Sequence, residues 1–410
     1  MSATELRASI FSGAFFFLVL FAYYVIRPVR EQLGAAAGGS AVLPWIWGMV
    51  FLVMLAATPL YGALVAKLSP RRFIPIVYAF FAVGMWVWAG FIPVEAPGRV
   101  FATAFYVWVG VFNLYVVTVF WSFMTDIFTS EQSKRLFGPI AIGGTIGALS
   151  GPAFAHVMVG RVGVPGLLVA SGILLACCIP VVALLVQWSK AHGKREAGHD
   201  NPIGGGLLAG ARALFRNPFL TRMALLLVLT DMIATVLYSL TSDVARSLYP
   251  DAEARTQFFA WIDLRANLAQ LIIQALLARF LLMRLGSHGT LVFVALVNAF
   301  ILAILAWHAT AFWLVFAIIA SRALGYGVVQ PARDSLYTRV DREERYKAKS
   351  FIDTVVWRGG DTLASFSLRG VQLLGASLGQ IAAIGVGFAL LSAWLSRNVH
   401  KQKGLNGNES

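Results

Sequence analysis

Charged residues and cysteines are scarce in this sequence. Only 13% of the 410 residues are Asp, Glu, Lys or Arg, against about 25% in soluble domains. The two cysteines, Cys177 and Cys178, are adjacent within an apolar run, where they can neither form a useful disulfide nor build a metal site. His156 and His308 have no second ligand at metal spacing. No catalytic constellation is recognisable, so the sequence predicts neither an enzyme nor a protein with a metal or another cofactor.

Apolar runs of about 20 residues recur along the whole chain, and each is long enough to cross a bilayer as a helix. Hydrophobic residues make up 59% of the sequence. The first run is too long for a cleaved signal peptide and is followed directly by arginines, so we expect it to stay in the protein. We predict an all-α, polytopic membrane protein with about twelve spans, near residues 9–30, 43–66, 73–93, 100–125, 136–159, 164–188, 218–241, 256–282, 289–307, 310–332, 349–370 and 375–396.

The basic residues are grouped in alternate loops between these runs. The formal net charge of +14 therefore indicates membrane topology and not nucleic-acid binding. The positive-inside rule predicts cytoplasmic N- and C-termini, in a cell membrane that would be the inner membrane of a bacterium. The basic loops hold Lys67, Arg71, Arg72, Lys134, Arg135, Lys190, Lys194, Arg195, Arg212, Arg216, Arg284, Arg339, Arg342, Arg345, Lys347, Lys349, Arg397, Lys401 and Lys403.

A polar interruption near the middle divides the chain. It predicts a six-helix half over 1–190, a cytoplasmic linker over 191–216, a second six-helix half over 217–398 and a disordered tail over 399–410. Two such halves are a common plan of transporters, with the substrate site between them near the bilayer midplane.

Two arginines stand at the end of the first apolar run, in the segment FAYYVIRPVRE over 21–31. Charge at membrane depth costs roughly 2.5–3.5 kcal/mol per residue, so it normally faces a cavity or a partner. Tyr23, Arg27 and Arg30 fall on one face of a helix, and Pro28 can kink that helix. The alternative is that both arginines extend to lipid headgroups.

The remaining intramembrane charge lies in a few spans only. Arginine suits phosphate or carboxylate bidentately, so the candidate substrate-binding residues are Tyr23, Arg27, Arg30, Asn113, Arg265, Arg322 and Arg358. The alternative is internal pairing, of Arg265 with Asp263 or Asp231 and of Arg358 with Asp361. Asp231 and Asp263 are also candidate proton carriers. The candidate gating or coupling residues are Glu31, Glu131, Lys134, Asp231, Asp263, Lys347, Asp353 and Asp361. We interpret the glycines at 143, 144 and 147 as sites of close helix packing.

The segment GALVAKLSPRR over 62–72 resembles the loop 2–3 signature of the major facilitator superfamily. Ala66 stands where that signature has Asp, and Ser69 where it has its second Gly. The resemblance implies a twelve-helix fold in which spans 3, 6, 9 and 12 are outer supports. Those spans carry essentially no internal charge here, in agreement with that implication.

Three further stretches resemble the ATP/ADP antiporter family of nucleotide exchangers. They are RPVREQL over 27–33, FWSF at 120–123 with EQSKRLF over 131–137, and PARD at 331–334 with KAKSFID over 347–353 and RGG at 358–360. The segment YSLTSD over 238–243 departs from the family, because it lacks the Lys found there in members that exchange ATP for ADP.

We therefore predict a secondary transporter that works by alternating access and exchanges an anionic metabolite. Nucleotides are the first candidates for that metabolite, because of the family resemblance. The alternatives are a proton-coupled symporter or drug exporter, and a non-transporting membrane scaffold or sensor. The expected partners are a small anionic substrate and the lipid bilayer, not nucleic acid.

Overall fold

The protein is described by a computed structural model that covers residues 3–67, 70–92, 98–192, 207–337, 340 and 351–398. Within these residues the chain forms helices and no strands. Lys347 and the tail over 399–410 lie outside the described residues, as does the linker up to residue 206. The last ten residues of the predicted linker form a helix, Leu207–Arg216.

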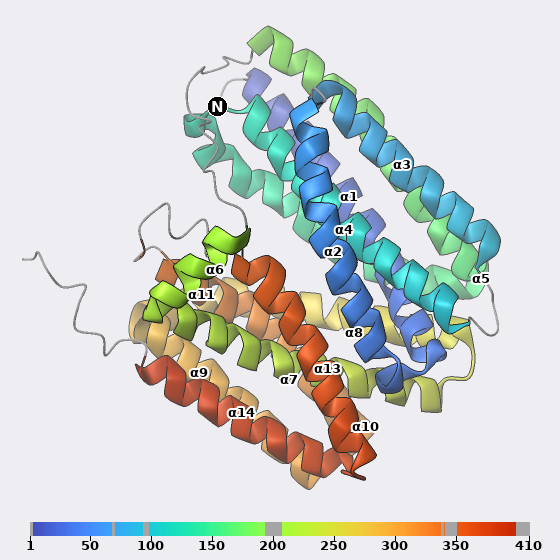
Figure 1. Ribbon diagram of the computed structural model, residues 1–410. Coiled ribbons are helices and arrows are strands. Elements are labelled where there is room, and N and C mark those ends of the chain that lie inside the picture. Colours follow the sequence, from blue (N-terminus) through green and yellow to red (C-terminus); the bar gives the residue numbers. More distant parts are fainter. Residues whose placement is uncertain are drawn as a thin grey trace, which may run out of the picture. The chain divides into compact units, whose positions relative to one another are not determined.

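Figure 1 shows the described residues as a set of helices. Three short π-helical segments, over 274–278, 325–329 and 352–356, interrupt or precede the later helices. The α-helices are α1 (Ala3–Ala37), α2 (Leu43–Lys67), α3 (Pro70–Phe91), α4 (Arg99–Ile127), α5 (Ser130–His192), α6 (Leu207–Arg216), α7 (Pro218–Leu248), α8 (Ala252–Ile273), α9 (Arg279–Trp307), α10 (Ala311–Leu324), α11 (Gln330–Leu336), α13 (Trp357–Leu373) and α14 (Leu378–Asn398).

Eight segments of the described chain are long and apolar enough to cross a membrane. Two of them, of 60 and 56 residues, are more than twice the length of one span. Each contains a glycine with non-helical backbone angles, Gly163 with φ 67° and Gly286 with φ 63°. Positive φ favours glycine, because a side chain would be strained there. These glycines separate predicted spans 5 and 6 and predicted spans 8 and 9, so the polytopic all-α fold is confirmed.

The chain forms two compact units that do not follow the sequence halves strictly. Unit 1 comprises residues 1–42, 52–201 and 245–264, and unit 2 comprises 43–51, 202–244 and 265–410. Each unit therefore includes a short segment from the other predicted half. Residues 245–264, which include the start of α8, belong with α1, α4 and α5.

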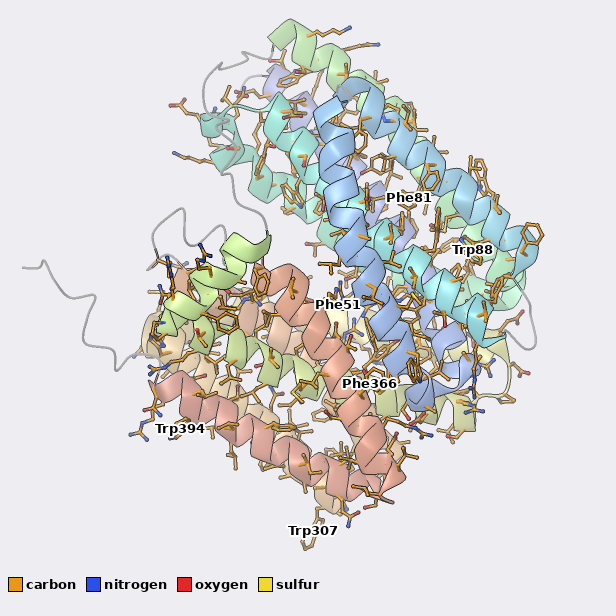
Figure 2. The ribbon with its side chains drawn as sticks, in the orientation of Figure 1. Phe51, Phe81, Trp88, Trp307, Phe366 and Trp394 are labelled. Atoms are coloured by element: carbon orange, nitrogen blue, oxygen red, sulfur yellow. The ribbon has the colours of Figure 1, made fainter. Side chains whose placement is uncertain are left out.

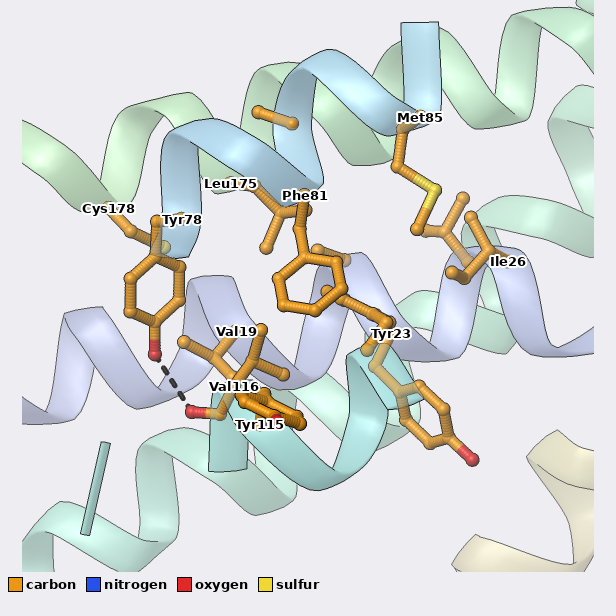
Figure 3. Close-up of a cluster of buried hydrophobic side chains, with 14 of the residues drawn as sticks. Val19, Tyr23, Ile26, Tyr78, Phe81, Met85, Tyr115, Val116, Leu175 and Cys178 are labelled. Carbon is orange, nitrogen blue, oxygen red and sulfur yellow. Dashed lines mark hydrogen bonds between the residues drawn. The ribbon is translucent and has the colours of Figure 1, made fainter. Parts of the chain in front are cut away.

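Helix α1 lies in the core of unit 1. Phe15 packs edge-on against Tyr78 and Phe120, with ring centroids 5.2 Å and 5.1 Å apart. The Tyr78 hydroxyl donates to the Val116 carbonyl at 2.9 Å, so this buried polar group is satisfied (Figure 3). Aromatic side chains thus fix α3 and α4 against the first half of α1.

The glycines of α5 allow it to approach α1 closely. A Cβ atom at Gly143 would lie 2.1 Å from the Gly13 carbonyl oxygen, and one at Gly147 would lie 2.5 Å from the Phe17 carbonyl oxygen. No side chain fits at such distances without a shift of the backbone. The predicted packing role of the glycine cluster is confirmed.

In unit 2, α14 packs against α9. A Cβ at Gly379 would lie 2.9 Å from the Ala306 carbonyl oxygen, and one at Gly385 would lie 3.3 Å from Leu302. Trp307 and Trp394 project outward from this pair of helices (Figure 2), with 84% and 60% of their surface exposed. Outward-facing tryptophans suit a surface in contact with lipid.

Candidate functional site

Arg27 forms an ion pair with an acidic residue of a distant helix. Its Nη1 lies 3.2 Å from Oδ1 of Asp263 on α8, and its Nε lies 3.6 Å from Oε1 of Glu31, one turn further along α1. The side chains of Arg27 and Asp263 are 15% and 3% exposed. Removal of one partner from a buried ion pair destabilises the protein by several kcal/mol, because the other charge is left unpaired.

Arg30 completes a buried network with the same glutamate. Its Nη2 forms a short ion pair with Oε1 of Glu31, and its guanidinium lies 4.6 Å from the ring centroid of Tyr106 on α4. The Tyr106 hydroxyl donates to Oε2 of Glu31 at 3.3 Å. We call Arg27, Arg30, Glu31, Tyr106 and Asp263 the arginine network; its two positive and two negative formal charges cancel.

The structure brings Tyr23 to this network, as predicted from helical spacing. Tyr23 is 8% exposed and interacts electrostatically with both Arg27 and Arg30. The Arg27 guanidinium also lies 5.7 Å from the ring centroid of Tyr24. Helix α1 runs without interruption through Pro28.

The alternative that Arg27 and Arg30 extend to lipid headgroups is wrong. Their side chains are only 15% and 11% exposed and are held in ion pairs. The carboxylates of Glu31 and Asp263 take the place that lipid phosphates would have as partners of the two arginines.

A second polar cluster lies in unit 2, between α7 and α13. The Trp357 indole N–H donates to Oδ1 of Asp231 at 2.8 Å, and the Thr235 hydroxyl donates to Oδ1 of Asp361 at 2.8 Å. Nη1 of Arg358 lies 3.4 Å from Oδ2 of Asp361, so the alternative of internal pairing is confirmed for Arg358. We call these five residues the carboxyl cluster.

The other candidates are spread over several helices. Asn113 on α4 and Arg322 on α10 are half-buried, and Arg265 on α8 is exposed. Glu131 and Lys134 are exposed at the start of α5. The side chain of Asp353 lies outside what the structure describes, as does Lys347. The structure thus brings seven of the candidates together, Arg27, Arg30, Glu31 and Asp263 in the arginine network and Asp231, Arg358 and Asp361 in the carboxyl cluster.

The contacts at the start of α5 involve residues that the sequence reasoning did not single out. Thr129 and Gln132 cap the helix reciprocally, at 3.1 Å and 3.3 Å. Gln132 Nε2 and Arg135 Nη2 then lie 3.2 Å and 3.5 Å from Oε1 of Glu5 on α1. The Thr-x-x-Gln spacing is a capping-box signal that was available in the sequence.

Three residues of the two clusters were also missed. Tyr106, Thr235 and Trp357 are uncharged, and a search for intramembrane charge does not select them. Trp357 directly precedes Arg358, which gives a weak signal, but only the fold places Tyr106 beside Glu31. Among the described residues, no three His, Cys, Asp or Glu side chains are grouped so as to hold a metal ion.

Comparison with known families supplies the identification of the fold and the broad function. The family profile described as Major Facilitator Superfamily matches residues 8–364. The chain belongs to the major facilitator superfamily. Members of this superfamily are membrane transporters that work by alternating access, and they are generally not enzymes.

Solved structures of the superfamily share the fold at low identity. A bacterial homologue of the iron transporter ferroportin, in an inward-facing state, gives a TM-score of 0.70 at 11% identity, covering 98% of this chain and 100% of the other. A bacterial homologue of the human lysosomal transporter Spinster gives 0.64 at 14%, covering 97% of each chain. The nucleoside transporter NupG gives 0.63 at 15%, covering 98% of this chain and 100% of the other.

These comparisons show the fold and leave the substrate class open. The solved structures are described as transporters of different substrates: nucleosides, peptides or metals among them. No curated protein sequence matches the chain. Nothing in the comparisons is specific to the ATP/ADP antiporters.

Proposed function

We propose that this protein exchanges a small anionic metabolite across a cell membrane, and that Arg27 is the principal contact of the anion. The observation that carries the proposal is the ion pair between Arg27 and Asp263 at 3.2 Å. A guanidinium held inside the membrane by a carboxylate on another helix offers a site where a second anion can take the place of that carboxylate.

The placement of the two carboxylates distinguishes Arg27 from Arg30. Glu31 is on α1 itself and contacts both arginines, so it stays beside them when helices move. Asp263 is on α8, and separation of α8 from α1 would leave Arg27 with only the longer contact to Glu31. Arg27 is also the more exposed of the two arginines, at 15% against 11%. It is therefore the arginine that an incoming anion meets first.

The exchange mode follows from the cost of unpaired buried charge. With the anion bound, Arg27 is neutralised by substrate; without it, Arg27 must recover Asp263 before the protein reorients. If substrate neutralises Arg27 better than Asp263 does, the loaded protein reorients faster than the substrate-free protein. Transport then proceeds faster by exchange than by net movement of substrate.

Nucleotides are the first candidates among anions. Support comes from the resemblance to the ATP/ADP antiporters at residues 27–33, in the same segment as the arginine network. The rings of Tyr23 and Tyr24 lie beside Arg27, and aromatic rings of this kind can stack on a base. The carboxyl cluster favours a second candidate, a proton-coupled carrier.

A thermal-shift screen of the purified protein in detergent tests the anion site. The ligands are nucleotides, sugar phosphates and carboxylates, since a ligand that binds the folded state raises its apparent stability. We expect at least one anion to raise the melting temperature of the wild-type protein and of Arg7→Ala, but not that of Arg27→Ala. Arg7 is the matched control, because it is an exposed arginine on the same helix.

Two results would reject the proposal. One is the absence of a shift with every anion tested. The other is an equal shift in wild type and Arg27→Ala, which would place the anion elsewhere. A shift with a carboxylate or a sugar phosphate, but with no nucleotide, would keep the anion site and reject the nucleotide assignment.

A further inference from the structure

Helices α7 and α13 exchange hydrogen bonds in a reciprocal pattern at the carboxyl cluster. Asp231 and Thr235 are one turn apart on α7, and Trp357 and Asp361 are one turn apart on α13. Each aspartate accepts a hydrogen bond from the other helix at 2.8 Å, Asp231 from Trp357 and Asp361 from Thr235. Residue 231 thus pairs with 357 and residue 235 with 361, so the two helices run parallel at this point. The pattern holds both carboxyl groups in the interface between the helices.

The two carboxyl groups also interact with each other. Asp361 is 5% exposed. Oδ2 of Asp231 is buried and has no hydrogen-bond donor; it lies 3.7 Å from where a Cβ atom on Gly360, the neighbour of Asp361, would be. A buried carboxylate oxygen without a donor is costly. The other three carboxylate oxygens of this pair have the donors Trp357, Thr235 and Arg358.

The formal charges of the cluster do not cancel. Asp231 and Asp361 carry two negative charges when both are ionised, and Arg358 supplies one positive charge. The groups that act electrostatically on Asp231 from α13 are Asp361 and Arg358, together with the indole of Trp357. One added proton would make the cluster neutral, as burial within a membrane favours.

We propose that Asp231 and Asp361 share one exchangeable proton and form the proton-binding site of this transporter. The proton on one carboxyl donates to the other, and Oδ2 of Asp231 then has its missing partner. Loss of the proton to water returns the cluster to a net charge of −1. This proposal rests on the second candidate function, a proton-coupled carrier, and deepens it by assigning the residues in unit 2 that bind the proton; it goes beyond anion exchange, which needs no proton site.

A proton fits this site better than a metal cation does. The side chains already direct an N–H group of Trp357, a hydroxyl of Thr235 and the Arg358 guanidinium at three of the four oxygens. A hard cation requires several oxygen ligands at once, whereas a proton requires one oxygen and one acceptor.

Infrared difference spectroscopy of the full-length protein in detergent, titrated with acid in the absence of any anionic substrate, tests the proposal. A protonated carboxyl has a C=O stretching band that is separate from the carboxylate bands. We expect wild type to gain this band as the pH falls from about 8 to about 6, a range in which exposed carboxyl groups, with pKa values near 4, stay ionised. Asp231→Asn and Asp361→Asn should each lose the band in that range. Asp251→Asn is the matched control, because Asp251 is exposed just before α8, and it should keep the band.

A further variant separates proton binding from a purely structural role. Trp357→Phe removes the N–H donor to Asp231 and leaves both carboxyls in place. A donor to a carboxylate stabilises its ionised form, so in this variant the band should persist to higher pH than in wild type. A merely structural pair would not show this shift.

Two results would overturn the proposal: a protonated-carboxyl band that survives both Asp231→Asn and Asp361→Asn in folded protein, or a band that is displaced when choline is replaced by Na⁺ at constant pH, which would indicate a cation site. The titration contains no nucleotide, sugar phosphate or carboxylate substrate, so its outcome is independent of the Arg27 proposal. If the expected band appears but the anion screen fails, only the anion site is rejected. If the anion screen succeeds but the band is absent, only the proton site is rejected.

Discussion

At the scale of single residues, the charged members of the arginine network are balanced in charge and divided between two helices. Arg27, Arg30 and Glu31 are on α1, and only Asp263 comes from α8. The partners on α1 keep their spacing during any movement of that helix, whereas the contact from α8 depends on how the two helices lie. In the proposed mechanism, an anion that displaces Asp263 from Arg27 would release α8 from α1 at this contact.

Replacement of Asp263 by Asn should make transport depend more strictly on exchange. The substrate-free protein would then leave Arg27 with only its contact to Glu31 at 3.6 Å, and loss of one partner from a buried ion pair costs about 3–5 kcal/mol. We expect tighter anion binding, because the competing carboxylate is gone, and slower net uptake with exchange preserved. Uptake into proteoliposomes with and without internal anion measures both rates.

Asp251→Asn is the control for this substitution, since it makes the same change at an exposed position. If Asp263→Asn leaves both net uptake and anion affinity at wild-type values, Asp263 is not the residue with which the anion competes.

At the scale of helices, the packing of α1 on α5 depends on the absence of side chains. Gly143, Gly147 and Gly151 of α5 face backbone or Cβ atoms of α1, where an added Cβ would come within 2.1 Å, 2.5 Å and 2.6 Å of its nearest neighbour. In a membrane, small residues allow such close packing and the contacts that hold helices together.

Gly143→Ala should therefore destabilise the protein. Overpacking of this kind costs about 1–3 kcal/mol, and here the obstructing atom is the Gly13 carbonyl oxygen, which cannot rotate away. Gly138→Ala on the same helix is the control, because a Cβ there meets nothing within 4 Å. Melting temperatures in detergent should fall for the first variant only. A fall of equal size in both would mean that loss of glycine, and not the contact with α1, is responsible.

The helices themselves were largely predictable from hydropathy. Runs of about 20 apolar residues predict spans, and the predicted limits of 100–125 agree with α4 at Arg99–Ile127. Gly163 and Gly286 lie within the predicted connections between spans. The structure shows that helix extends up to each glycine from both sides, so that each connection is a kink and not a loop. The sequence does not predict this. The π-helical segment over 352–356, directly before Trp357, was not foreseen, since it follows from local packing and leaves no periodic signal.

The sequence predicts which residues form the candidate site better than it predicts which of them contact one another. The search for intramembrane charge selected Arg27, Arg30, Glu31, Asp231, Asp263, Arg358 and Asp361. It gave Arg358 its partner, because Asp361 is three residues away on the same helix. It did not pair Arg27 with Asp263, because such a contact depends on the fold and not on spacing.

At the scale of the whole molecule, the distribution of basic residues predicts that both termini are cytoplasmic. Labelling of single cysteines by a membrane-impermeant maleimide tests this, in a background with Cys177→Ala and Cys178→Ala. Glu95→Cys, in a predicted external loop, should react in intact spheroplasts. Lys403→Cys, in the tail, should react only after permeabilisation. The reverse pattern would contradict the predicted orientation.

The measurement that tests the central claim most directly is anion exchange in proteoliposomes loaded with the anion that gives the largest thermal shift. Uptake of the same labelled anion is compared in wild type, Arg27→Ala and Arg7→Ala. Loss of a charge-assisted contact is worth about 1.5–3 kcal/mol, which is tenfold or more in rate. We expect uptake that internal anion accelerates in wild type and Arg7→Ala, and a fall of about tenfold or more in the accelerated rate in Arg27→Ala. Near-normal uptake by well-folded Arg27→Ala would contradict the assignment of Arg27 to the anion site.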